Sequence, residues 1–159
     1  MMIRIVLAGL VIVVAGLAAT YWFVCPCEQI PGGALSGETA VQHPADWSFT
    51  NDAARVPLCQ IEVDFPITRS MNVNCMSVDS QLYVSCSGCA DKVWAARAAD
   101  FPAGRVRVAG NIYPVIYRRE TSDINLDQIW STRANKLGQQ PSPRPDHWWS
   151  FHLAAPDPG

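Results

Sequence analysis

The sequence has few of the signals that identify the common enzyme classes. It contains no Gly-x-Ser-x-Gly element, no phosphate-binding loop and no dinucleotide fingerprint, so nothing supports a hydrolase or nucleotidase. Its three histidines are scattered and no second cysteine pair stands at ligand spacing, so no metal site is predicted. The formal net charge is −2 and no basic cluster is present, which excludes a nucleic-acid partner.

Charge and proline are both missing from Ile5 to Val24. A run of this length is typical of a helix that spans a bilayer, and it ends in aromatic residues of the kind that settle at a membrane interface. We therefore expect residues 3–24 to contact membrane lipid. The alternative is a cleaved signal peptide, because small residues around Ala18 supply a plausible cleavage site.

The charges that flank this run predict its orientation. Arg4 precedes it, whereas the first charge after it is Glu28 and the first cation is Arg55. This bias favours a single-pass cell-membrane protein with a cytoplasmic amino terminus and a periplasmic or extracellular domain.

The length of 159 residues suits one globular domain plus an anchor. We expect a transmembrane anchor over 1–24, a flexible proline- and glycine-rich tether over 25–45, a barrel domain over 46–153 and a disordered tail over 154–159.

The stretch from Met71 to Ser87 has the clearest secondary-structure pattern in the domain. Apolar and polar residues alternate on both sides of Asp79-Ser80, which predicts a β-hairpin with a two-residue turn. In that register Asn74 lies opposite Ser85, and Cys75 lies opposite Val84. One face of the hairpin is apolar. The other carries Asn72, Asn74, Tyr83, Ser85 and Ser87, a surface for a polar ligand or simply for water.

The remaining elements complete a mainly β fold with helices. Alternation predicts a strand over 56–63, a second hairpin over 105–118 and a last strand over 148–153, and helical patterns cover 90–100 and 121–137. This order is that of a small antiparallel barrel whose openings are covered by helices.

Five stretches in this order resemble the FMN-binding split β-barrels, over about Ala45 to Leu153. They are Asp46-Trp47-Ser48-Phe49, Leu82-Tyr83-Val84-Ser85, Ser87-Gly88-Cys89-Ala90-Asp91-Lys92-Val93-Trp94, Val106-Arg107-Val108-Ala109-Gly110-Asn111-Ile112-Tyr113-Pro114-Val115 and Trp149-Ser150-Phe151-His152-Leu153. The chain looks most like the pyridoxamine-phosphate-oxidase-like and deazaflavin-dependent nitroreductase branches. It lacks the basic-His-Pro and Asn-Leu elements usual in the deazaflavin branch.

The resemblance implies FMN or a deazaflavin as cofactor, with its acidic group at the start of the helix after the third strand. Free amides at a helix amino terminus favour an anion there, and Gly88 allows the backbone to approach it. Ser87, Gly88, Lys92 and, more weakly, Arg97 are the candidates for this contact. Lys92 and Arg97 have the alternative role of solvated helix charges.

The ring of the cofactor would meet other residues. By resemblance, Trp94 stacks on the ring, while Asn72, Asn74 and Ser85 bond to its edge. The alternative for Trp94 is core filling.

Two functions follow from this reading. The first is a membrane-anchored flavin- or deazaflavin-dependent oxidoreductase. No catalytic residue is identified for it, and Tyr83 and Tyr113 are the candidate proton donors. The second is a barrel without cofactor that serves as an accessory or assembly subunit of a membrane complex. Split barrels often pair as homodimers across the cofactor face.

Six cysteines in an exported chain predict disulfides, with fifteen full pairings open. Cys59 and Cys75 can lie across from one another if their strands pair. Cys86-Ser87-Gly88-Cys89 has the spacing of a thiol redox pair, but no βαβ pattern surrounds it, which favours a local structural disulfide or two buried thiols. Cys25 and Cys27 could bridge to a partner subunit.

Overall fold

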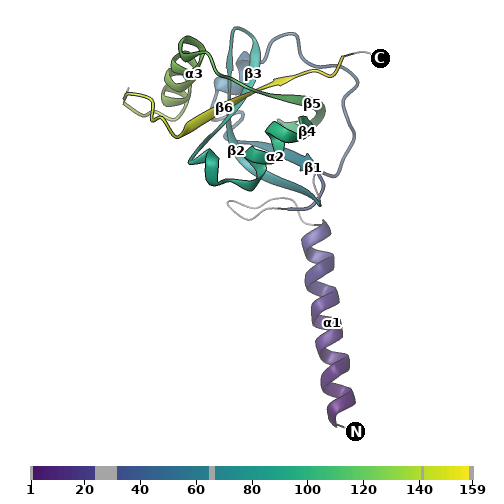
Figure 1. The fold of residues 1–159 in the computed structure, drawn as a ribbon. Helices are drawn as coiled ribbons and strands as arrows, with labels where there is room; N and C mark the ends of the chain where they lie inside the picture. Colours follow the sequence, from purple (N-terminus) through teal and green to yellow (C-terminus); the bar gives the residue numbers. More distant parts are fainter. Residues whose placement is uncertain (1, 24–31, 65–66, 141, 158–159) are drawn as a thin grey trace.

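A computed structural model describes residues 2–23, 32–64, 67–140 and 142–157 (Figure 1). Cys25 and Cys27 lie outside the described residues. Helix α1, Met2–Phe23, forms in the apolar amino-terminal run and stands clear of the barrel in Figure 1. Among the described residues, no helix combines the length and apolarity needed to cross a membrane, so the predicted transmembrane anchor is not found there.

The domain is a closed antiparallel barrel, as the strand pattern predicts. Its order is β1-β2-β3-β6-β5-β4, and each strand pairs antiparallel with both neighbours. The strands are β1 Cys59–Asp64, β2 Thr68–Val78, β3 Gln81–Ser87, β4 Ala103–Val108, β5 Asn111–Arg119 and β6 Trp148–Ala154. The helical elements of the domain are η1 Ser48–Asn51, η2 Cys89–Asp91, α2 Val93–Asp100 and α3 Asp123–Lys136.

The β2–β3 hairpin has the predicted register. Asn74 pairs with Ser85 and Cys75 with Val84. Asp79 and Ser80 both have positive φ, at 49° and 63°, as a tight two-residue turn requires. The first strand begins at Cys59 rather than at 56, because Pro57 cannot donate to the ladder.

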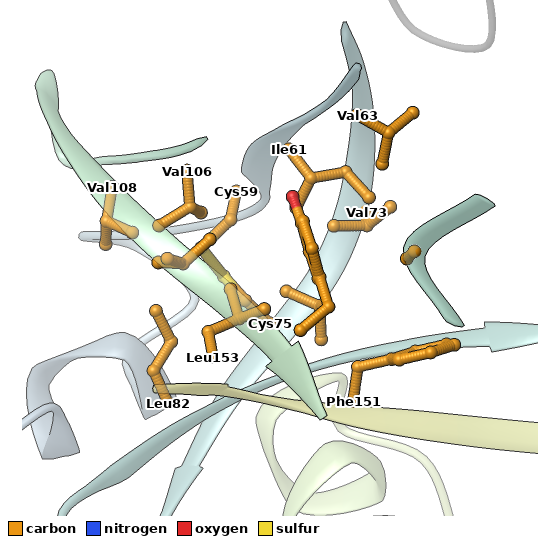
Figure 2. Packing of buried hydrophobic residues seen from close by; sticks show 14 of the residues in the cluster. Cys59, Ile61, Val63, Val73, Cys75, Leu82, Val106, Val108, Phe151 and Leu153 are labelled. Atoms are coloured by element: carbon orange, nitrogen blue, oxygen red, sulfur yellow. A yellow bond between two sulfur atoms is a disulfide. The ribbon is translucent and has the colours of Figure 1, made fainter. Parts of the chain in front are cut away.

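Apolar side chains fill the barrel interior (Figure 2). The cluster includes Ile61, Val84, Val106 and Phe151, each fully buried, and α2 adds Trp94, Ala95 and Ala98. These contacts follow from strand alternation, since every second side chain points inward.

A second apolar cluster lies between the outer face of the sheet and α3. Leu126 and Ile129 of α3 pack with Met76, Tyr83 and Trp148. The outer face of β2, β3 and β6 is therefore partly covered by protein.

The described part of the predicted tether, 32–45, lies on the barrel. Gly32 forms a bridge to Ser70, and Thr39 forms one to Ile112. Leu35 is 2% exposed. Burial of an apolar side chain together with backbone pairing fixes this segment, so the folded domain begins before the predicted boundary. At its other end β6 includes Ala154, the first residue of the predicted tail.

Candidate functional site

The predicted anion site lies at the β3–α2 corner, defined here as Cys86–Lys92. β3 ends at Ser87, and Gly88 adopts the left-handed conformation with φ 60°. The η2 turn follows, and Lys92 is extended at φ −95° and ψ 117°. The α-helix therefore begins at Val93 rather than at 90, so Gly88 does not sit at its amino terminus.

Backbone bonds inside the corner use two of its amides. The Asp91 N–H donates to the Gly88 carbonyl at 3.3 Å, and the Lys92 N–H donates to the Cys89 carbonyl at 3.0 Å. The Lys92 carbonyl accepts from Ala95 and Ala96. These amides are satisfied by the chain itself, which weakens the electrostatic case for an anion at this corner.

A disulfide within the corner joins Cys86 to Cys89, whose Cα atoms are 5.5 Å apart. A second disulfide joins Cys59 on β1 to Cys75 on β2. The register places Cys59 directly opposite Val73, so this bond runs diagonally between the strands.

Four of the predicted ligand contacts alternate along β2 and β3 on the outer face of the sheet. Asn72 and Asn74 are half-buried, and Ser87 is exposed with its Oγ 3.1 Å from Nε2 of His147. Ser85 is 3% exposed, and its Oγ has no hydrogen-bond partner within the described part of the chain. Of this set the register brings Asn74 and Ser85 together as direct neighbours.

Trp94 lies on the other side of the β-sheet wall. It is 9% exposed and belongs to the interior cluster, with its ring 5.6 Å from that of Phe151. Strand alternation places Ser85 and Phe151 on opposite faces. Trp94 and the outer-face residues therefore do not surround one flavin ring, and the full predicted set does not fit that cofactor.

The two predicted basic contacts follow the corner. Lys92 is exposed where α2 begins, and Arg97 is half-buried one helical turn later.

The candidate proton donors are also separated by the sheet. Tyr83 stands on the outer face 5.3 Å from the His152 ring, and burial, with smaller contributions from Glu120 and Asp79, raises its pKa. Tyr113 points into the interior cluster. No common site includes both.

A partly buried ion pair was missed by sequence reasoning. Glu62 on β1 lies directly opposite Arg105 on β4 and is 5% exposed. The hydrogen bonds from Arg105 raise the pKa of its guanidinium. The hydroxyl of Tyr117 donates to the Glu62 carbonyl at 2.9 Å. Burial raises the pKa of the Tyr117 hydroxyl strongly. Only the strand register brings these residues together, so sequence alone offers no signal.

Lys136 at the end of α3 was also missed. It is 9% exposed, and its Nζ donates to the Cys75 carbonyl at 2.6 Å. Burial lowers the pKa of Lys136 to about 8, partly opposed by the charge of Asp52. A lysine among the last residues of a predicted helix is ordinarily assigned to solvent, which hid this role.

Comparison with known proteins supports the fold. No family model matches the sequence, and no curated protein matches it. Among solved structures, the chain is similar to a Listeria innocua protein provisionally assigned as a pyridoxamine 5′-phosphate oxidase, with a TM-score of 0.52 and 7% identity. The match covers 61% of this chain and 82% of that one. At this identity the likeness shows a split-barrel fold.

Proposed function

We propose that this protein is a membrane-attached split barrel that acts outside the cytoplasm as a non-catalytic accessory or assembly subunit of a membrane complex. The observation that carries this proposal is the position of Trp94 in the barrel core, on the opposite side of the sheet from Asn74 and Ser85. The side chain that would stack on a cofactor ring instead fills the interior. A fold of this kind does not by itself bring an activity with it.

The exposed side chains of α1 support attachment to a membrane. Val6, Leu10 and Ile12 are 70%, 61% and 71% exposed. Large apolar surface of this extent on one element favours contact with lipid over contact with water. Membrane lipid is therefore the proposed partner of residues 3–24, with Arg4 on the cytoplasmic side.

The two disulfides support export of the barrel. Cys59–Cys75 and Cys86–Cys89 are both closed. Such bonds form and persist in oxidising compartments and are rare in the cytosol. A periplasmic or extracellular domain agrees with the orientation that the flanking charges predict.

Flavin or deazaflavin binding is the second candidate. It is supported by the similarity to the protein provisionally assigned as a pyridoxamine 5′-phosphate oxidase, and by the buried Ser85 Oγ without a partner among the described residues. Because Trp94 does not reach the outer face, Asn72, Asn74, Ser85 and Ser87 are the residues left there to meet the ring of such a cofactor. Gly88, Lys92 and Arg97 stay the candidates for its acidic group. A homodimer across that face would complete the site.

Cofactor binding decides between these candidates. The detergent-solubilised full chain is purified, its visible absorption is recorded, and it is titrated with FMN and with a deazaflavin. The accessory role predicts a colourless protein that takes up neither. Uptake by the native chain that is lost in Ser85→Val would establish the second candidate and overturn the first.

Membrane attachment has its own test. The full chain should float with phosphatidylglycerol-containing vesicles, and a variant with Val11→Arg and Val14→Arg should not, because charge on α1 opposes contact with lipid. A barrel-surface variant, Lys92→Ala, serves as control. Equal flotation of all three proteins would contradict attachment through α1.

A further inference from the structure

The disulfide at the β3–α2 corner contributes little as a structural crosslink. It joins residues separated by 3 positions, whereas Cys59–Cys75 joins residues separated by 16. A disulfide stabilises a fold mainly by closing a loop of the unfolded chain, and the effect grows with the size of that loop. The corner bond closes almost no loop, so folding stability alone does not explain it.

The two cysteines of the corner differ in exposure. Cys89 is 0% exposed, whereas Cys86 is only partly buried and is followed by the exposed Ser87. By contrast, Cys59 and Cys75 are both 0% exposed inside the barrel. Of these four cysteines Cys86 is the one that keeps surface in contact with solvent, so attack by an external thiol is expected there.

Backbone contacts that do not involve the sulfurs also hold the corner. Cys86 and Ser87 pair with Trp149 and Trp148 across the β3–β6 ladder. The turn itself is closed by the bond from the Lys92 N–H to the Cys89 carbonyl. These contacts would hold the two cysteines near each other when the sulfur–sulfur bond is open.

The reduced form also has a place for a proton. Cys89 Sγ lies 2.7 Å from the Cys86 carbonyl oxygen, which can accept a hydrogen bond from a Cys89 thiol. A Cys89 thiol would therefore have an acceptor within the corner.

From these four observations we propose that Cys86–Cys89 is a redox-active disulfide that exchanges with the dithiol of an exported partner protein. A thiolate of the partner attacks Cys86 Sγ, the bond to Cys89 breaks, and Cys89 leaves as a thiolate. The second thiolate of the partner then attacks its own sulfur in the mixed disulfide and releases Cys86. The partner is oxidised by two electrons to a disulfide, and its two thiol protons end on Cys86 and Cys89.

The two disulfides of the same molecule supply the test and its control. The oxidised full chain in detergent is equilibrated with graded ratios of reduced and oxidised dithiothreitol, quenched with acid and alkylated. Peptide mass spectrometry then reports each cysteine pair separately, and near-ultraviolet circular dichroism reports the fold. We expect Cys86–Cys89 to open and close reversibly with the native spectrum unchanged, while Cys59–Cys75 stays closed. Opening of both pairs together, or only with loss of the native spectrum, would overturn the proposal.

Single-cysteine variants test which sulfur is attacked. Cys89→Ser leaves the accessible Cys86 thiol, and Cys86→Ser leaves the buried Cys89 thiol. With oxidised glutathione as probe, the first variant should form its mixed disulfide at least about tenfold faster than the second, because exchange depends on access. Equal or reversed rates would contradict the assignment of Cys86. If either variant fails to fold, the titration of the unmodified chain still decides, and neither result depends on α1 or on a cofactor.

Discussion

Arg105 binds the carboxylate of Glu62 through two parallel hydrogen bonds. The Arg105 Nε and Nη2 atoms each lie 2.7 Å from one of its oxygens. The same carboxylate accepts the backbone N–H of Leu35 at 2.5 Å. Glu62 thus joins β1, β4 and the segment before the barrel, which ties the amino-terminal part of the domain to the sheet.

We expect Glu62→Gln to destabilise the domain by about 2 kcal/mol, because Arg105 loses its charged partner and the amide cannot accept both bonds. The loss is moderate because the Arg105 side chain is 31% exposed and water can solvate its guanidinium. Urea unfolding measures the change. Asp123→Asn is the control, since Asp123 is 85% exposed in its pair with Arg144 and should contribute less than about 1 kcal/mol. Equal losses of unfolding free energy in the two variants would contradict a larger contribution from the Glu62–Arg105 pair.

Position 104 requires glycine because of close contacts and not because of its backbone angle. A Cβ atom there would lie 2.4 Å from the Glu62 carbonyl oxygen and 2.5 Å from Cε2 of Tyr117. Gly104→Ala should therefore displace β4 from β1 and cost more than about 2 kcal/mol in unfolding free energy.

Gly110→Ala provides the matched control for this substitution. Gly110 has φ +88° but open space around its missing Cβ, so only backbone strain of about 1 kcal/mol is expected. Thermal unfolding of both variants compares the two causes. A Gly104→Ala protein as stable as Gly110→Ala would contradict the close approach.

Much of the barrel could be predicted because its signals are local. The β2–β3 hairpin shows alternation on both strands and a turn of two residues between them, so Asn74 and Ser85 could be paired from the sequence. The β4–β5 hairpin is similar, with Ala109 and Gly110 in its turn.

The site was harder to predict because its features depend on contacts between distant segments. Residues 32–45 carry no periodicity, yet Leu35 is buried and bound to Glu62. Glu62 and Arg105 are 43 positions apart and meet only through the β1–β4 register. The sequence pattern extends the helix back into the corner, but Lys92 is extended and separates η2 from α2. A turn of this kind is set by packing and by backbone bonds within the corner, which local propensity does not report.

The core position of Trp94 leads to a stability prediction. Trp94→Ala should lower the unfolding free energy by about 3 kcal/mol, because it leaves a cavity next to Phe151. Lys92→Ala, two residues earlier and exposed, should change it by less than about 0.5 kcal/mol. Urea titration followed by circular dichroism measures both. If Trp94→Ala leaves the unfolding free energy nearly unchanged, Trp94 does not fill the core and becomes a candidate ligand contact again.

Lys136 predicts how stability depends on pH. Its pKa is about 8 in the folded protein, whereas a freely solvated lysine has a pKa of 10.5, so the unfolded chain binds more protons between these values. Stability from this group is therefore fully present above pH 10.5 and is lost as the pH falls through 8. Below pH 8 the folded protein carries a charged, poorly hydrated ammonium.

The difference between the native chain and Lys136→Met isolates this effect from other titrating groups. Urea unfolding at about pH 7 and about pH 9.5 should show the native chain gaining about 1 to 2 kcal/mol relative to the variant at the higher pH. Lys92→Met, at an exposed position, should show no such gain. Lys136→Met also removes the donor to the Cys75 carbonyl, but that loss is the same at both pH values and does not alter how stability changes with pH. A pH profile shared by all three proteins would mean that Lys136 is solvated in the folded state.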